Sequence, residues 1–141
     1  MRAASILLAL ACLATPALAS EEPKESKSAG QYIDVSPVAL PVIVKGRLIN
    51  YVFVTVRLNL AGGADPVALR IKEPYLRDAL VRVAYRTPFT DPKSYTRLNE
   101  AAIKAAMARE AVRIIGPRAV TTVEITNSTP QKLSGLPKPA A

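Results

Sequence analysis

The stretch Leu48–Leu60, LINYVFVTVRLNL, decides the fold because its side chains alternate over its whole length. One set of alternate positions is apolar apart from Asn50: Leu48, Val52, Val54, Val56, Leu58 and Leu60. The other set begins with Ile49, Tyr51 and Phe53 and ends with Thr55, Arg57 and Asn59. This pattern predicts one long strand with a buried face. The opposite face is predicted to be apolar in its first half and solvated in its second.

The residues before this strand predict further strands and a hairpin. Lys45-Gly46-Arg47 fits a tight hairpin turn with Gly46 at positive φ. Tyr32–Val35 and Val42–Val44 have the alternation and β-branched content of two short strands. The prolines between them, Pro37 and Pro41, predict that regular structure is broken there.

The residues after the long strand predict a turn and then helices. Ala61–Ala64 contains two glycines and reads as a turn, and Asp65-Pro66 fits a helix start with Asp as N-cap. Pro74 either kinks this short helix or begins a second one. The second helix has one apolar stripe at helical spacing, formed by Tyr75, Leu76, Ala79, Leu80, Val83 and Ala84.

An alanine-rich segment predicts the last helix. Asp91-Pro92 repeats the start signal, and Lys93–Ile115 has strongly helical composition. Its expected core stripe consists of Leu98, Ala101, Ala102, Ala105, Val112 and Ile115. Gly116-Pro117 ends the helix, and Val120–Ile125 reads as a final strand. The predicted fold class is α+β, a small, mostly antiparallel sheet with one long central strand and two helices packed on one face.

The N-terminus has the features of an export signal. Residues 1–19 combine the basic Arg2, an apolar run and an Ala17-Leu18-Ala19 cleavage pattern, so cleavage is expected between Ala19 and Ser20. The alternatives are an uncleaved anchor and, as a minor one, a lipoprotein acylated at Cys12. The resulting domain division is a signal peptide over 1–19, a flexible linker over 20–31, an α+β domain over 32–127 and a disordered Pro-rich tail over 128–141.

Composition argues against much enzyme chemistry. The 141-residue chain has no histidine and a single cysteine, which the predicted cleavage removes. A His-based triad, a zinc site with His ligands and a disulfide are therefore excluded. No pair of carboxylates is singled out for acid–base catalysis. The sequence predicts a non-enzyme with no catalytic residues, no metal and no cofactor, and a small hydrolase is the weakest alternative.

The net charge of +8, which cleavage lowers to +7 by removing Arg2, is the strongest bulk signal. For an exported chain this favours an anionic membrane surface or an acidic partner over nucleic acid. Arg77, Arg82 and Arg86 recur along one helix and form the candidate basic binding surface. The alternative is a solvated surface with incidental charge. Ile49, Tyr51 and Phe53 form the candidate apolar docking face.

Three stretches resemble the periplasmic domain of the flagellar basal body-associated FliL family. They are Ile49–Leu60 (INYVFVTVRLNL), Glu73–Leu80 (EPYLRDAL), and the helix from Leu98 to Ile114 with the Gly116-Pro117 end and the strand Ala119–Thr126. The resemblance covers roughly residues 32–127. Two features depart from the family pattern. The family has an uncleaved N-terminal transmembrane helix, and its closing Phe-x-x-Gln is replaced here by Ile125–Ser128.

The resemblance implies a stomatin/prohibitin-like domain that forms rings around flagellar stator units in the periplasm and is not an enzyme. The leading hypothesis is therefore a periplasmic protein that self-associates or docks on an inner-membrane complex, with the flagellar motor stator as the partner the family suggests. The departures leave room for a paralogue with another partner. The alternative hypothesis is a free periplasmic protein whose basic surface binds an anionic component of the envelope.

Overall fold

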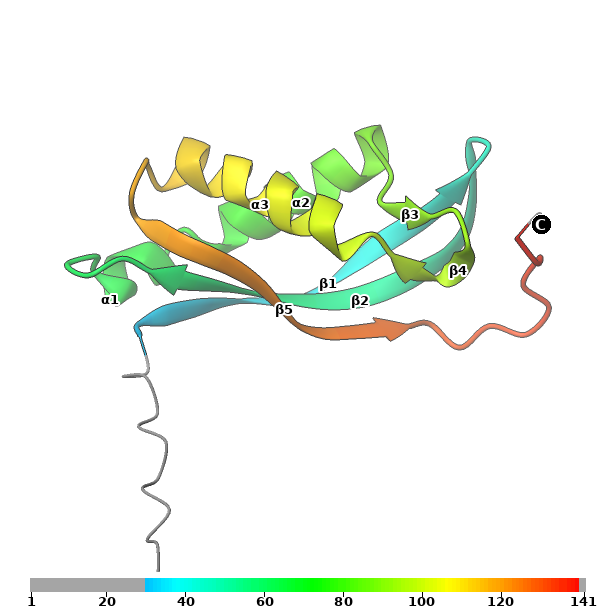
Figure 1. Cartoon of the computed structure of the whole chain (residues 1–141), viewed down its shortest axis with the longest axis horizontal. Coiled ribbons are helices and arrows are strands. Elements are labelled where there is room, and N and C mark those ends of the chain that lie inside the picture. The colour runs from blue at the N-terminus through cyan, green and yellow to red at the C-terminus, as the bar shows by residue number, and fades with distance from the viewer. Residues whose placement is uncertain (1–29, 140–141) are drawn as a thin grey trace, which may run out of the picture.

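The computed structural model describes residues 30–139 and has an α+β architecture, which confirms the predicted fold class. Strands β1, β2 and β5 form an antiparallel sheet with β2 in the centre, and β3 pairs with β4 in a small hairpin. Helices α2 and α3 cover one face of the larger sheet (Figure 1). The elements are β1 (Tyr32–Val44), β2 (Arg47–Leu60), α1 (Pro66–Arg70), α2 (Glu73–Arg86), β3 (Thr90–Asp91), β4 (Ser94–Leu98), α3 (Glu100–Ile114) and β5 (Val120–Pro130).

Strand β2 has the predicted buried face along most of its length. Its core residues are Val52, Val54, Val56, Leu58 and Leu60, all nearly inaccessible to solvent. They pack beneath α2 and α3, whose own buried stripes are Leu76, Ala79, Leu80 and Ala84, and Ile103, Ala106, Met107 and Ala111.

The alternation of β2 changes near the hairpin, where the prediction was wrong for Leu48 and for Ile49. Val42 pairs with Asn50, and Ile43 pairs with Leu48, so Ile49 is an extra residue on β2. A bulge of this kind reverses which face the following side chains occupy. As a result Leu48 is 49% exposed, whereas Ile49 is half-buried and packs against the core.

Strand β1 is one continuous strand, and the predicted break at its prolines does not occur. Its pairing with β2 shifts register between Val35 and Val38, and Pro37 lies in that irregularity. Proline is tolerated at this place because β1 is an edge strand, where a missing N–H costs no ladder hydrogen bond. The predicted hairpin turn is confirmed, with φ of +50° at Lys45 and +75° at Gly46.

The Asp-Pro start signal was right once and wrong once. Asp65 caps α1 by accepting a hydrogen bond from the Val67 N–H at 2.8 Å. Asp91 instead accepts from the Lys93 N–H at 2.8 Å and closes the turn between β3 and β4. The same side-chain acceptor serves a helix cap or a turn. Residues 94–98 form β4, so α3 begins only at Glu100, and Asn99 is its N-cap.

This later start goes with a different core stripe on α3. Five of the six predicted core positions are not buried: Ala101, Ala105 and Val112 are exposed, and Ala102 and Ile115 are half-buried. Leu98, which was expected within this helix, is buried from β4. The prediction followed the many alanines and overlooked Ile103 and Met107. These larger side chains face the core, where they bury more apolar area than alanine would.

The last strand is longer than predicted. β5 continues to Pro130, so Ser128–Pro130 belong to the sheet rather than to a disordered tail. Residues 131–139 follow without regular structure apart from a turn at Ser134–Gly135.

The predicted signal peptide and most of the predicted linker lie outside the described residues. No helix between residues 30 and 139 has the length and apolar character needed to cross a membrane.

Candidate functional site: the open edge of the sheet

The two edges of the main sheet differ in how they are protected. On the β1 edge, the Ser36 N–H donates to Glu73 Oε1 at 2.9 Å. Farther along, Thr90 Oγ1 accepts from the Ile43 N–H at 3.0 Å and donates to the Ile43 carbonyl oxygen at 2.9 Å. Pro37 and Pro41 remove two more donors from this strand. Such features prevent a foreign strand from adding to an edge.

The β5 edge has no side-chain hydrogen bond to a described element other than β2 and no proline before Pro130 within residues 30–139, although bulges at Thr121 and Thr126 interrupt its pairing with β2. β5 pairs with β2 on one side, and no main-chain or side-chain hydrogen bond from another described element reaches its other side. Ten residues, from Val120 to Thr129, precede its only proline. A strand edge of this length carries a row of main-chain donors and acceptors that water satisfies until another strand replaces it.

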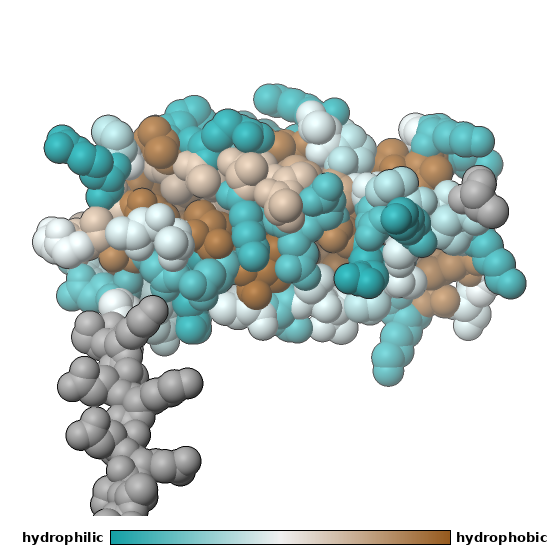
Figure 2. Space-filling view, viewed as in Figure 1, coloured by the Kyte–Doolittle hydropathy of each residue, from teal (hydrophilic) through white to brown (hydrophobic). Residues whose placement is uncertain are grey.

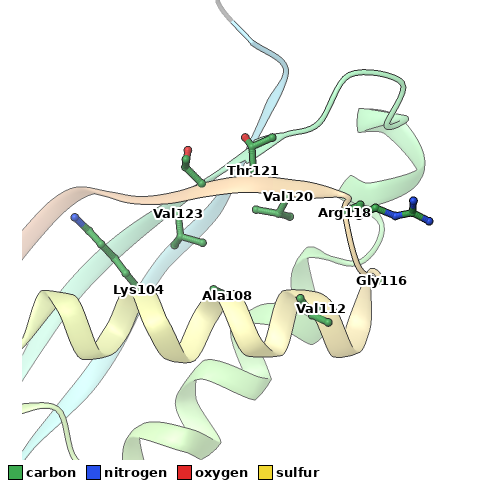
Figure 3. A pocket seen from close by; sticks show the side chains of 9 residues that line it. Lys104, Ala108, Val112, Gly116, Arg118, Val120, Thr121 and Val123 are labelled. Carbon is green, nitrogen blue, oxygen red and sulfur yellow. The ribbon is translucent and has the colours of Figure 1, made fainter.

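A groove runs beside this open edge, between β5 and α3 (Figure 3). Its volume is about 380 Å³. Ala108 and Val112 line it from the helix, and Val120 and Val123 point toward the helix from the strand. Figure 2 shows pale and hydrophobic surface over α3 that continues into hydrophobic surface beneath it. Ala101 and Ala105, which are also exposed, extend the small-residue face of α3.

Two cations border the groove. The Lys104 side chain extends from α3 toward β5, and Arg118 lies at the opposite end, after the glycine that ends the helix (Figure 3). Neither cation belongs to the ion pairs formed within residues 30–139, which join Arg57 to Asp34, Arg82 to Asp78 and Arg113 to Glu110. The groove therefore combines an apolar floor, unpaired main-chain groups and positive charge at its ends.

On the face of the sheet away from the helices, polar side chains form hydrogen bonds with one another across neighbouring strands. Arg57 donates two hydrogen bonds to the Asp34 carboxylate, at 2.7 and 2.9 Å, and its guanidinium lies 3.9 Å from the centre of the Tyr32 ring. This contact lowers the pKa of Asp34, and the Asp34 carboxylate in turn raises the pKa of Arg57. Asn59 Nδ2 donates to Thr122 and Glu124 across the β2–β5 pair. These side chains satisfy one another's hydrogen bonds, and the Asp34 and Arg57 charges are paired.

The predicted apolar docking face is only partly assembled. Ile49 is half-buried and packs against the core, as described above. Tyr51 and Phe53 do lie on the outer face of the sheet, and Phe53 is 42% exposed. The Tyr51 hydroxyl lies 3.2 Å from the Tyr85 hydroxyl, and this hydrogen bond raises the pKa of Tyr85. The outer face of the sheet therefore has two of the three predicted residues, Tyr51 and Phe53, and Tyr51 is hydrogen-bonded to α2 through Tyr85.

The predicted basic surface is brought together only in part. Arg77, Arg82 and Arg86 are all exposed, as expected. Arg77 and Arg82, however, are five residues apart, which turns them about 140° from each other around the helix axis. Arg82 also pairs with Asp78. Arg82 and Arg86, four residues apart, share a face of α2, whereas Arg77 lies on the other side of the helix, and the charge of Arg82 is paired with Asp78. The predicted cleavage residues, Ala19 and Ser20, lie outside the described residues.

Residues 30–139 contain no cluster of three or more His, Cys, Asp or Glu side chains that could hold a metal ion. The β5 edge was not identified from the sequence as a candidate site. Whether a strand lies at an unpaired edge depends on the order of strands in the sheet, which hydrophobic periodicity does not reveal. One available signal was the run from Val120 to Thr129, which lacks proline and has Glu124 as its single charged residue. The chain matches no protein-family model and no curated protein.

Proposed function

We propose that this chain is a non-enzymatic periplasmic interaction domain that binds a protein strand along the open edge of β5. The contrast between the protected β1 edge and the open β5 edge is the observation that supports it. In strand addition, main-chain hydrogen bonds provide affinity and alternate side chains enter pockets. Here, alternate side chains of the added strand would enter the groove beneath α3, and Lys104 and Arg118 would favour acidic residues near its ends.

Self-association is the simplest form of this binding. Two copies of β5 that pair antiparallel would join two sheets into one and place two α3 helices side by side. The exposed Ala101, Ala105 and Ala108 lack long side chains, so they would allow close helix approach. The same edge could instead receive a strand from an inner-membrane complex. The resemblance to the FliL family makes the flagellar motor stator the first complex to test.

A substitution in the groove tests this proposal without disturbing the core. Ala108→Arg places a long charged side chain over the edge at an exposed helical position, where the fold tolerates arginine. Ala68→Arg, at an exposed position on α1, is the matched control. Sedimentation equilibrium of the purified chain measures self-association, and co-purification with isolated stator units measures docking.

We expect Ala108→Arg to reduce association at least tenfold, whereas Ala68→Arg should leave it unchanged. The proposal is wrong if the wild-type chain neither self-associates nor binds stator units. It is also wrong if both variants associate as well as wild type, because the open edge would then not be the contact.

The proposed location depends on the N-terminal signal. Export with cleavage between Ala19 and Ser20 would release the domain into the periplasm. Sequencing the N-terminus of the chain isolated from the periplasmic fraction should give Ser-Glu-Glu. If residues 1–19 are retained on chain recovered from membranes, the anchored topology of the FliL family applies instead.

A further inference from the structure

A second groove lies at the end of the sheet that carries the β1–β2 turn, away from the β5 edge and α3. Its volume is about 690 Å³, nearly twice that of the α3–β5 groove. The hairpin supplies one wall, β4 contributes Tyr95, and the segment after β5 supplies the other wall. The apolar residues that line it are Val44, Leu48, Ile49, Tyr95, Leu133, Leu136 and Pro137.

One buried side chain holds the walls of this groove in place. Asn50 is 1% exposed, and its Nδ2 donates to the main-chain oxygens of Tyr95 and Gln131, each at 3.4 Å. The Gln131 N–H also donates to the Tyr51 carbonyl oxygen at 2.8 Å. The hairpin, β4 and the C-terminal segment are therefore tied together at the base of the groove, although they are far apart in sequence.

The second groove is lined by both apolar and positively charged side chains. Leu48 and Leu133 are 49% and 45% exposed, unusually large fractions for leucine side chains that share one groove. Lys45, Arg47 and Lys138 line the groove with them, and no acidic side chain does. None of these three cations takes part in an ion pair within residues 30–139. At the right-hand end of Figure 2, hydrophobic surface is bordered by hydrophilic side chains.

We infer that this hairpin end docks on the surface of an anionic phospholipid bilayer. Exposed leucines beside unpaired cations match the layered chemistry of a bilayer interface, where phosphates lie above the first acyl carbons. Leu48 and Leu133 would enter the acyl boundary, while Lys45, Arg47 and Lys138 contact lipid phosphates. All three cations are exposed, and Lys45 lies beside Gly46 at the tip of the hairpin. This inference does not rest on the proposed strand addition, because it uses other residues.

Vesicle sedimentation tests whether the three cations contribute to binding of the bilayer. The chain isolated from cells is mixed with vesicles of phosphatidylcholine, with or without phosphatidylglycerol. The test variant is Lys45→Asn/Arg47→Gln/Lys138→Gln, in which asparagine keeps the positive φ accessible. The control, Arg77→Ser/Arg82→Ser/Arg86→Ser, removes the same charge from α2. Each cation near such a surface contributes about fivefold, or about 1 kcal/mol, to partitioning.

We expect the hairpin variant to lower partitioning at least tenfold and the α2 variant to lower it by less than about threefold. Equal losses in the two variants would show that net charge alone causes binding, and the inference would be wrong. Absence of wild-type binding to phosphatidylglycerol vesicles at low salt would also overturn it. Binding to a soluble acidic protein without vesicle binding would overturn it in favour of a protein partner.

A second pair of variants tests the apolar part. Leu48→Ser/Leu133→Ser removes the two exposed leucines, and Val67→Ser/Ile71→Ser removes two apolar residues that are 75% and 70% exposed near α1. Only the leucine variant should lose the binding that survives 0.5 M salt, because apolar insertion is not screened. Circular dichroism confirms that each variant is folded. If both pairs bind like wild type, the leucines do not enter the bilayer and the inference fails.

Discussion

Thr90 and Ile43 form a two-way hydrogen-bonded contact that closes one edge of the sheet. The Thr90 hydroxyl accepts from the Ile43 N–H at 3.0 Å and donates to the Ile43 carbonyl oxygen at 2.9 Å. One side chain thereby occupies both main-chain groups that an incoming strand would need at this residue. The contact also attaches the β3–β4 hairpin to β1, so protection of the edge and placement of the hairpin have the same physical basis.

Replacing Thr90 by valine should open this edge with little change in shape. The two hydrogen bonds are partly buried, so their loss should lower the free energy of unfolding by about 1–2 kcal/mol. The Ile43 amide should exchange with solvent markedly faster, which hydrogen–deuterium exchange measures. Thr87→Val, at an exposed position after α2, is the control and should change neither quantity. Unchanged exchange at Ile43 in Thr90→Val would show that the hydroxyl does not protect the edge.

The long strand and the core face of α2 could be predicted because they depend on local periodicity, whereas the core face of α3 could not be read from its alanine-rich composition. Val52 to Leu60 alternate without interruption, and a buried face follows from that pattern alone. The bulge at Ile49 could not be predicted, because it reflects how β1 and β2 align at the hairpin. Asp91-Pro92 was ambiguous for a similar reason, since the carboxylate of Asp caps helices and turns equally well.

The candidate sites were largely hidden from sequence reasoning because they depend on tertiary neighbours. The openness of β5 follows from its place at the end of the sheet, and the hairpin-end groove joins residues near 45, 95 and 135. Spacing along a helix also fixes direction around it, so Arg77 lies about 140° from Arg82, and only Arg82 and Arg86 of the candidate basic surface share a face of α2. Leu48 and Lys45 were assigned to the core and to a turn, so neither was considered a binding residue.

A pair of aspartate substitutions tests the facing of β2. Val54 is 1% exposed and has no charged partner, so Val54→Asp should lower the free energy of unfolding by at least about 3 kcal/mol. Thr55 is half-buried on the outer face, where water reaches its side chain, so Thr55→Asp should cost about 1 kcal/mol or less. Urea denaturation of both variants measures the difference. Equal unfolding midpoints would contradict the assigned facing.

Asn50 offers a test of how the C-terminal segment is held. Asn50→Leu keeps the side-chain volume similar but removes donors to Tyr95 and Gln131 and the acceptor for the Tyr51 N–H. The cost should be about 1–3 kcal/mol, because buried main-chain groups lose their partners. Trypsin should cleave after Lys132 sooner in this variant, since the segment beyond β5 loses an anchor. Asn127→Leu, on the exposed part of β5, should be cleaved at the wild-type rate. Cleavage at equal rates in the two variants would show that Asn50 does not hold the segment.

The Asp34–Arg57 contact should make a small, pH-dependent contribution to stability. Arg57 lowers the pKa of Asp34 in the folded chain below its ordinary value of 3.8. A carboxylate with a lowered pKa stabilises the fold above its unfolded pKa and loses this contribution as the pH falls through the folded pKa. Asp34→Asn should therefore melt below wild type at pH 7, and the two curves should converge as the pH falls from about 4 to 2. Because both side chains are partly exposed, 0.5 M salt should narrow the difference at pH 7. A melting difference that persists unchanged at pH 2 would mean that Asp34 acts through packing and not through its charge.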